Sequence, residues 1–134
     1  MGEIKVYDLS TNSVKFELKG HTGGVWDLIL SEDKKTLFSA SWDKTIRSWD
    51  LTTKQCIMTM KGHTHYVYKL LLFKPGVLVS TSYDSTIMFW DVKSGQSIHS
   101  LKGHKGHVFD ITLFKNGILA SVGEDKTIRL WKGL

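Results

Sequence analysis

Short apolar segments alternate with polar turns along the chain. The apolar segments are rich in Val, Ile and aromatic residues, and Gly, Asp, Ser and Lys stand between them. Segments of this composition are typical of β-strands, and the residues between them are typical of tight turns. The hydrophobic pattern therefore predicts a protein built from strands.

The predicted strands fall into three successive groups with a partial group in front. The three groups comprise Val25–Leu30, Thr36–Ser41, Thr45–Asp50, Gln55–Met60, Val67–Phe73, Val77–Ser82, Thr86–Asp91, Ser97–Leu101, Val108–Phe114, Ile118–Val122 and Thr127–Trp131. In the partial group, Ile4–Leu9 matches the third strand of the later groups (IKVYDL against IRSWDL and IMFWDV), and Val14–Leu18 matches the fourth. The last group has three strands and lacks a fourth.

A sequence repeat underlies these groups. The dipeptide Gly-His recurs three times with a period of 41 or 42 residues, and a tryptophan follows each copy 27 or 28 residues later. A unit of this length is too short to be a domain, so each unit must bury its apolar face against its neighbours. We predict one array of units with boundaries at 1–19, 20–61, 62–102 and 103–134.

Four short antiparallel strands in a unit are typical of a propeller blade. The repeated motifs are Gly-His, then Ser-x-x-x-Asp, then Thr-Ile-x-x-Trp, in register three times. On these motifs the chain, over essentially its whole length, resembles the WD40-repeat β-propeller family. The resemblance implies an all-β propeller fragment of four-stranded antiparallel blades, with three and a fraction blades in this chain.

In WD40 proteins a buried, hydrogen-bonded tetrad of His, Ser, Asp and Trp ties the strands of a blade together. The resemblance places the tetrads at His21, Ser39, Asp43, Trp49; His63, Ser80, Asp84, Trp90; and His104, Ser121, Asp125, Trp131. A buried carboxylate needs such partners, and these side chains can form one satisfied chain of hydrogen bonds. Two departures lie near the ends: Tyr7 replaces Trp in the partial unit, and Lys132 replaces Asp after Trp131.

The same Ser, His and Asp residues raise the question of a hydrolase. Three copies would make three active sites, each serine is predicted inside a strand without a nucleophile elbow, and in the family these residues are structural. We therefore expect that this protein is not an enzyme. The remaining histidines, His65, His99 and His107, lack a ligand spacing such as His-x-x-x-His, so neither a metal nor another cofactor is expected.

The resemblance also implies a docking surface on the narrower top face of the propeller. In the family this face is built from the third and fifth positions after the Gly-His histidine and from the residue before the tetrad Asp. Those positions hold Gly24, Trp26, Trp42, Tyr66, Tyr68, Tyr83, His107, Phe109 and Glu124. Six of the nine are Trp, Tyr or Phe, against 11% of the whole chain.

Aromatic residues supply large apolar area with little rotamer entropy, as binding hot spots do. We expect Trp42 and Tyr83, on the turns before the tetrad Asp, to bind a partner. For Trp26, Tyr68 and Phe109 an alternative stays open, because rings at the mouth of the channel also pack on one another.

The leading functional hypothesis is a non-catalytic scaffold or adaptor that docks a protein or peptide on this face. The nine positions hold no Arg or Lys, which disfavours a phosphopeptide, whereas rings suit an aromatic-anchored peptide or a cation. Nucleic acid is disfavoured because no basic stripe interleaves with the rings. The rival hypothesis is an autonomous half-propeller whose specific partner is another copy of itself.

Charge and cysteine content add little to this interpretation. The net charge of +5 mildly favours acidic partners, but 16 of the 18 basic residues are lysines scattered over turns and strand ends. Cys56 is the single cysteine, which excludes an intramolecular disulfide and favours the cytoplasm, with the nucleus left open. No targeting segment or bilayer-spanning apolar run is visible, so no membrane association is expected.

Three and a fraction blades are too few for a closed ring, since propellers have about 4 to 8. Open ends would expose strand edges and apolar blade faces. One route to closure is a head-to-tail homodimer with six blades, in which Val14–Leu18 of one copy fills the vacant fourth position of the other, leaving the fate of Ile4–Leu9 open. The other route is a longer propeller whose further blades complete the ring.

Overall fold

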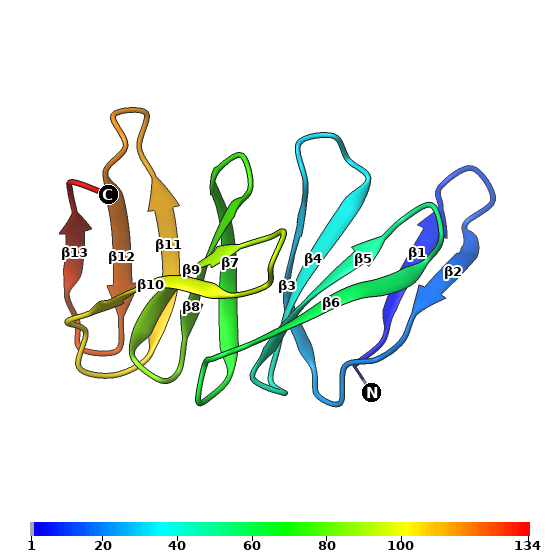
Figure 1. Cartoon of the computed structure of the whole chain (residues 1–134). Coiled ribbons are helices and arrows are strands. Elements are labelled where there is room, and N and C mark those ends of the chain that lie inside the picture. Colours follow the sequence, from blue (N-terminus) through cyan, green and yellow to red (C-terminus); the bar gives the residue numbers. More distant parts are fainter. Residues whose placement is uncertain (1) are drawn as a thin grey trace.

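The computed structural model describes residues 2–134, and this part of the chain contains strands and turns but no helix. Its strands form four antiparallel sheets that stand side by side in chain order, as Figure 1 shows. The N-terminal sheet lies at one end of the row and the C-terminal sheet at the other. The all-β class and the four-stranded blades predicted from the sequence are confirmed.

The first sheet has two strands and the next has four. Strands β1 (Ile4–Asp8) and β2 (Ser13–Leu18) form the N-terminal pair. The second sheet contains β3 (Val25–Leu30), β4 (Thr36–Ser41), β5 (Thr45–Asp50) and β6 (Gln55–Lys61), paired in chain order.

The third sheet repeats the four-stranded arrangement, and the last sheet has three strands. They contain β7 (Val67–Lys74), β8 (Val77–Ser82), β9 (Thr86–Asp91), β10 (Ser97–Lys102), β11 (Val108–Leu113), β12 (Leu119–Gly123) and β13 (Ile128–Trp131). Every strand lies within one residue of its predicted bounds. The turn residues that separate the apolar segments account for this agreement.

The core consists of three clusters, each between two neighbouring sheets. Phe38 and Ile46 of the second sheet pack with Leu70 and Leu78 of the third, and equivalent clusters join the other neighbours. The second strand of a full blade is buried on both faces, so β4 and β8 read as nearly continuous runs of buried residues. Strand β7 contacts both β3 and β11, which places the first strands of the blades on the inner side of the arc.

Candidate functional site

The twelve predicted tetrad residues form three hydrogen-bonded chains, one in each of the last three sheets. In the first, Ser39 Oγ lies 2.6 Å from His21 Nε2 and accepts a hydrogen bond from Trp49 Nε1 at 2.9 Å, while His21 Nδ1 lies 2.7 Å from Asp43 Oδ2. The same bonds recur at His63, Ser80, Asp84, Trp90 and at His104, Ser121, Asp125, Trp131. One tautomer satisfies each chain: the Ser hydroxyl donates to Nε2, and Nδ1–H donates to the carboxylate.

The tetrad carboxylates collect further donors from the turns around them. Asp43 accepts hydrogen bonds from the backbone N–H of Thr22 at 3.1 Å and from the Thr45 hydroxyl at 2.6 Å. Burial alone would raise the pKa of Asp43, but the bonds from Thr45 and His21 outweigh it and hold that pKa below its usual value. Burial lowers the pKa of His21 despite the opposing carboxylate, so a neutral imidazole is favoured beside an ionised Asp43.

The other two carboxylates behave in the same way. For Asp84, burial again opposes ionisation, and the hydrogen bond from His63 contributes most to keeping its pKa well below the usual value. For Asp125, the backbone N–H of Lys105 contributes most to a similar lowering of the pKa. Each tetrad is therefore a structural clamp that depends on an ionised carboxylate.

The order Ser–His–Asp within each tetrad is the order found in a hydrolytic triad, but the serines are inaccessible. Ser39, Ser80 and Ser121 are each 0% exposed. Each Oγ also accepts a bond from an indole N–H, which occupies the oxygen that would attack a substrate. A nucleophile must reach its substrate, so this geometry supports a structural role and not acyl transfer.

A β-bulge at the start of each inner strand places three of the predicted docking residues. The register of β3 against β4 shifts between Val25 and Asp27, so Trp26 is the extra residue. The same shift makes Tyr68 the extra residue in β7 and Phe109 the extra residue in β11. Bulges redirect side chains, and these three turn toward one rim of the arc.

A backbone hydrogen bond joins the other docking positions within each blade at the same rim. The N–H of Trp42 donates to the carbonyl of Gly24 at 2.9 Å, and the N–H of Tyr83 donates to the carbonyl of Tyr66 at 2.9 Å. Glu124 and His107 form the equivalent bond at 2.8 Å in the last blade. The turn before the tetrad Asp is thus tied to the loop that follows the Gly-His motif.

The β-bulges and the backbone hydrogen bonds together bring the rings of neighbouring blades into contact. Trp26 packs against Trp42 with ring centroids 5.1 Å apart, and Trp26 and Phe109 each lie 5.8 Å from Tyr68 in an edge-on arrangement. Tyr83 continues the series toward the last blade, where it contacts His107. We call the connected set the aromatic surface: Trp26, Trp42, His65, Tyr66, Tyr68, Tyr83, His107 and Phe109.

Exposure differs among the members of the aromatic surface. Trp26, Trp42 and Phe109 are 51%, 43% and 46% exposed, whereas the tyrosines are half-buried among the other rings. Tyr83, which the sequence favoured as a contact residue, lies between His65 and His107. The rings therefore pack on one another and also present a broad exposed apolar face.

His65 is the member of this surface that the sequence motifs do not mark. Its ring stacks on Tyr83 with centroids 4.1 Å apart and meets Tyr66 edge-on. It stands two positions after a tetrad histidine, a place that holds Gly23 in the first blade and Gly106 in the third. Only the loop conformation shows that this side chain joins the neighbouring rings.

One acidic docking position borders the aromatic surface. Glu124, the acidic docking position, lies 3.5 Å from His107 and its side chain is 57% exposed. Burial raises the pKa of Tyr68, and the neighbouring tyrosines and Glu124 add to this effect. Within residues 2–134 the one cation–π contact is that of Lys54 with Phe16, so no Lys or Arg covers a ring of the aromatic surface.

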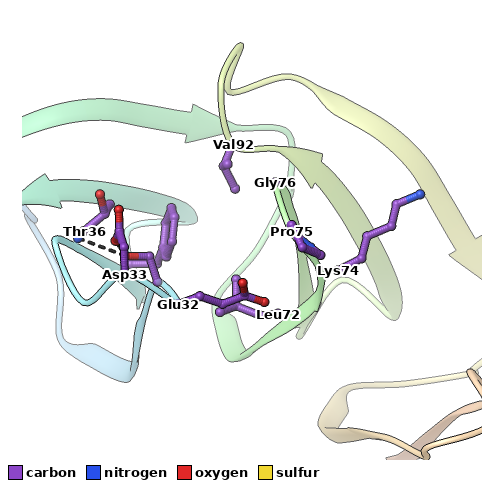
Figure 2. A pocket seen from close by; sticks show the side chains of 10 residues that line it. Glu32, Asp33, Thr36, Leu72, Lys74, Pro75, Gly76 and Val92 are labelled. Atoms are coloured by element: carbon purple, nitrogen blue, oxygen red, sulfur yellow. Dashed lines mark hydrogen bonds between the residues drawn. The ribbon is translucent and has the colours of Figure 1, made fainter.

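The opposite rim carries a hollow between the first two full blades. Figure 2 shows the loop of Glu32 and Asp33 facing the loop of Lys74 and Pro75. Asp33 is tied into its own loop, where it accepts hydrogen bonds from the Ser31 hydroxyl and the backbone of Lys35. The Ser31 hydroxyl also accepts a hydrogen bond from the backbone N–H of Thr36, so these polar groups of the loop already bond to one another, and the hollow is not the site that the geometry favours. Across residues 2–134, His, Cys, Asp and Glu form no group of three suited to a metal.

Comparison with known proteins defines the class. The fold and the tetrads are those of a β-propeller built from WD repeats, and the family model for "WD domain, G-beta repeat" matches residues 12–50, 54–91 and 95–132. The chain belongs to the WD40 repeat family, whose propellers are commonly non-catalytic scaffolds for protein interaction. Each matched repeat runs from the fourth strand of one blade through the third strand of the next, so β1 is the strand that no repeat includes.

Two relatives illustrate the similarity. A solved structure of the WD40 β-propeller domain of Doa1 superposes with a TM-score of 0.85 and 32% identity, covering 98% of this chain and 44% of that chain. Periodic tryptophan protein 2 of Saccharomyces cerevisiae is 45% identical over 47 residues, which are 35% of this chain and 5% of that protein. The chain thus spans less than half the length of either relative. The described residues contain no helix able to cross a membrane.

Proposed function

We propose that this protein is a non-catalytic adaptor or scaffold that docks a peptide or protein on the aromatic surface. The observation that carries the proposal is the unbroken contact of eight aromatic rings across three blades at one rim. Large exposed apolar patches on folded proteins mark interaction sites. Trp and Tyr are also the residue types that dominate binding energy at interfaces.

The ligand that fits this surface is a peptide with an apolar or aromatic anchor, or one that places a cation over the rings. Trp26, Trp42 and Phe109 offer the exposed area, and Glu124 supplies a negative group at the edge of the last blade. Because the half-buried tyrosines hold these rings in place, little side-chain entropy is lost on binding. A rigid, preformed surface of this kind favours recognition over catalysis.

Peptide selection tests the proposal. A random phage-displayed peptide library is selected on the 134-residue protein, and the enriched peptides are measured by fluorescence anisotropy against the wild type, Trp42→Ala and Tyr83→Ala. We expect enriched sequences with aromatic, apolar or basic anchors and weaker binding to both variants while circular dichroism shows an intact fold. Failure to enrich any sequence, or equal affinity for wild type and variants, contradicts docking on this surface.

A second candidate function is that of a structural unit whose specific partner is another copy of itself. Exposed apolar residues on the last sheet, such as Ile128 at 74% exposure, favour this candidate. The expected assembly is a head-to-tail homodimer that closes a six-bladed ring. Sedimentation equilibrium decides the point, since a stable monomer at micromolar concentration would exclude the homodimer.

A further inference from the structure

The last sheet exposes a face that the preceding sheets bury. Ile128 is 74% exposed, whereas Ile46 and Ile87, at the same position of the repeat, are 0% and 1% exposed. Leu130 is 55% exposed, whereas its equivalent Phe89 is 4% exposed. In the second and third sheets this face packs against the next sheet of the row.

The outer edge of the same sheet is also unpaired. Strand β13 pairs with β12 on one side, and within residues 2–134 no strand pairs with its other side. The equivalent strands β5 and β9 each pair with a fourth strand. An apolar edge strand of this kind is a template for another strand.

At the other end of the row, β1 occupies the place of a third strand in front of the first full blade. Ile4 aligns with Ile128 in the repeat and is only 5% exposed, packed in one cluster with Leu18, Leu37 and Trp49. Its register with β2 pairs Ile4 with Leu18, as Ile46 pairs with Met60 in the first full blade. The surface that would receive β13 is therefore present in this chain and is covered by β1.

We propose that β13 of a second copy replaces β1 on β2, so that two chains close into a ring by reciprocal strand exchange. This inference rests on the self-association proposed above and names the contact that makes it. Ile128 then packs against Leu18 and Leu37 where Ile4 lies now. Two copies so joined contain six blades of four strands each, with both β1 strands displaced.

The charges in the exchanged register are complementary. Lys5 lies opposite Glu17 in the β1–β2 pair, with Nζ 3.8 Å from the carboxylate, and Arg129 is the residue of β13 that aligns with Lys5. The exchange therefore sets Arg129 opposite Glu17 and keeps a cation beside that carboxylate. Lys19, which lies 3.0 Å from Glu17, is undisturbed because it follows β2.

The second copy also offers a better third strand than β1 does. Strand β1 carries Tyr7, which is 51% exposed and takes the place of the tetrad tryptophan. Strand β13 carries Trp131, whose indole donates to Ser121 at 2.9 Å, and it arrives already paired with β12. A two-stranded sheet is marginally stable alone, whereas a four-stranded blade with its tetrad is a complete unit. The packing between the two chains would then be of the same kind as the packing between neighbouring sheets within one chain.

Opposing substitutions test the exchange. Sedimentation equilibrium compares the wild type with Ile128→Asp, Ile4→Asp and the control Ile98→Asp, whose side chain is 56% exposed on β10. We expect a reversible wild-type dimer, a monomer for Ile128→Asp, at least about tenfold tighter dimerisation for Ile4→Asp, and no change for Ile98→Asp. A wild-type monomer overturns both self-association and exchange. A wild-type dimer that Ile128→Asp and Ile98→Asp affect equally overturns the exchange alone.

A crosslink provides a second readout that does not depend on stability. In a Cys56→Ser background, Leu37→Cys and Ile128→Cys are combined in one chain; these residues lie in sheets at different places in the row, so one chain cannot join them. Under oxidation we expect an intermolecular disulfide that yields covalent dimers on a non-reducing gel. The matched pair Leu37→Cys and Ile98→Cys should stay monomeric. Absence of covalent dimer from the first pair, or equal yield from both, overturns the exchange.

Discussion

Trp42 stacks on Tyr66 across the boundary between the first two full blades, with ring centroids 5.3 Å apart and planes inclined by 25°. The contact joins a turn of one blade to a loop of the next, so the aromatic surface belongs to the arc as a whole. Trp42 also packs against Trp26 and keeps 43% of its area exposed. It is therefore placed to bind a ligand while its inner face holds the neighbouring rings.

Replacing this tryptophan separates binding from folding. We expect Trp42→Ala to weaken the binding of a selected peptide by about 2 kcal/mol, or roughly 30-fold in affinity, because a central hot-spot ring is lost. The free energy of unfolding should fall by less than about 1.5 kcal/mol, the usual worth of an aromatic pair. Anisotropy titration and urea denaturation measure the two quantities.

Phe114→Ala is the matched control for Trp42→Ala. Phe114 is 46% exposed, but it lies in the turn after β11, at the rim opposite the aromatic surface. Its replacement should leave the affinity for the peptide unchanged. If both variants lost affinity equally, the peptide would not be docking on the aromatic surface.

Replacing the tetrad serines is expected to lower the stability by amounts that differ between blades. Ser80→Ala removes the acceptor of the Trp90 indole and the partner of His63, both of which are buried. We expect the free energy of unfolding to fall by about 1 to 3 kcal/mol, because the groups left behind are unpaired in a dry site. Urea denaturation monitored by circular dichroism provides the measurement.

The last sheet supplies the internal comparison. Trp131, unlike Trp90, is partly exposed, so water can reach its indole N–H when the serine is removed. Ser121→Ala should therefore lower the free energy of unfolding by less than Ser80→Ala does. Ser97→Ala, at an exposed position, should leave it almost unchanged. Equal losses for all three serines would argue against a stabilising tetrad.

Acid should destabilise the protein in two stages. The pKa of His21 lies below its usual value of 6.5 because of burial, so the unfolded chain binds this proton first, and stability begins to fall as the pH drops below about 6.5. The pKa values of Asp43, Asp84 and Asp125 are also lowered, by the hydrogen bonds described above, so their contribution is complete above the usual 3.8 and is lost at lower pH.

Thermal denaturation between pH 3 and pH 8 measures this dependence. We expect the midpoint temperature to decline modestly from pH 7 to pH 5 and steeply below pH 4. In His21→Gln the decline between pH 7 and pH 5 should be smaller, while the loss below pH 4 persists. A midpoint that rises on acidification would contradict a neutral His21 imidazole paired with an ionised Asp43.

Asp27 forms a hydrogen bond between two blades. Its Oδ2 accepts the backbone N–H of Leu70 in β7 at 2.8 Å and lies 3.6 Å from Lys69 Nζ. Asp27→Ala leaves the part-buried N–H of Leu70 without this partner, so we expect a loss of about 1 to 3 kcal/mol in urea denaturation. Asp27→Asn retains an oxygen that can accept this hydrogen bond, so its loss of stability should be smaller.

Asp110 occupies the same repeat position in the last inner strand and serves as the control. Within the described residues it accepts only the backbone N–H of the next residue, Ile111, at 2.8 Å, and it has no bond to a neighbouring sheet. Asp110→Ala should therefore change the stability by less than about 0.5 kcal/mol, the usual range for a surface substitution. A loss equal to that of Asp27→Ala would show that the bond to Leu70 is not what matters.

Local sequence predicts the strands closely because each is bounded by turn residues. The carboxylates of Asp43, Asp84 and Asp125 each accept a backbone N–H two residues on, and Lys44, Ser85 and Lys126 follow them with positive φ. Such turns are encoded within a few residues, so the motif suffices to place them. The family resemblance adds the docking positions, because they are counted from the same motifs.

The place of His65 could not be predicted in this way. No repeat motif marks it, and its stacking on Tyr83 depends on how the loop after His63 folds over the turn before Asp84. The bulge at Tyr68 is equally invisible, because a bulge is a property of the pairing between two strands. Ring contacts between blades depend on both.

The sequence alone determined the repeat and the strands, because these depend on short-range patterns that recur three times, and the family resemblance added the residues of the tetrads. The tertiary structure decided which equivalent residues are covered. Ile46, Ile87 and Ile128 stand in similar local sequences, yet the first two are buried and the third is exposed. Burial depends on whether another sheet packs on that face, and only the arrangement of the sheets in space settles this.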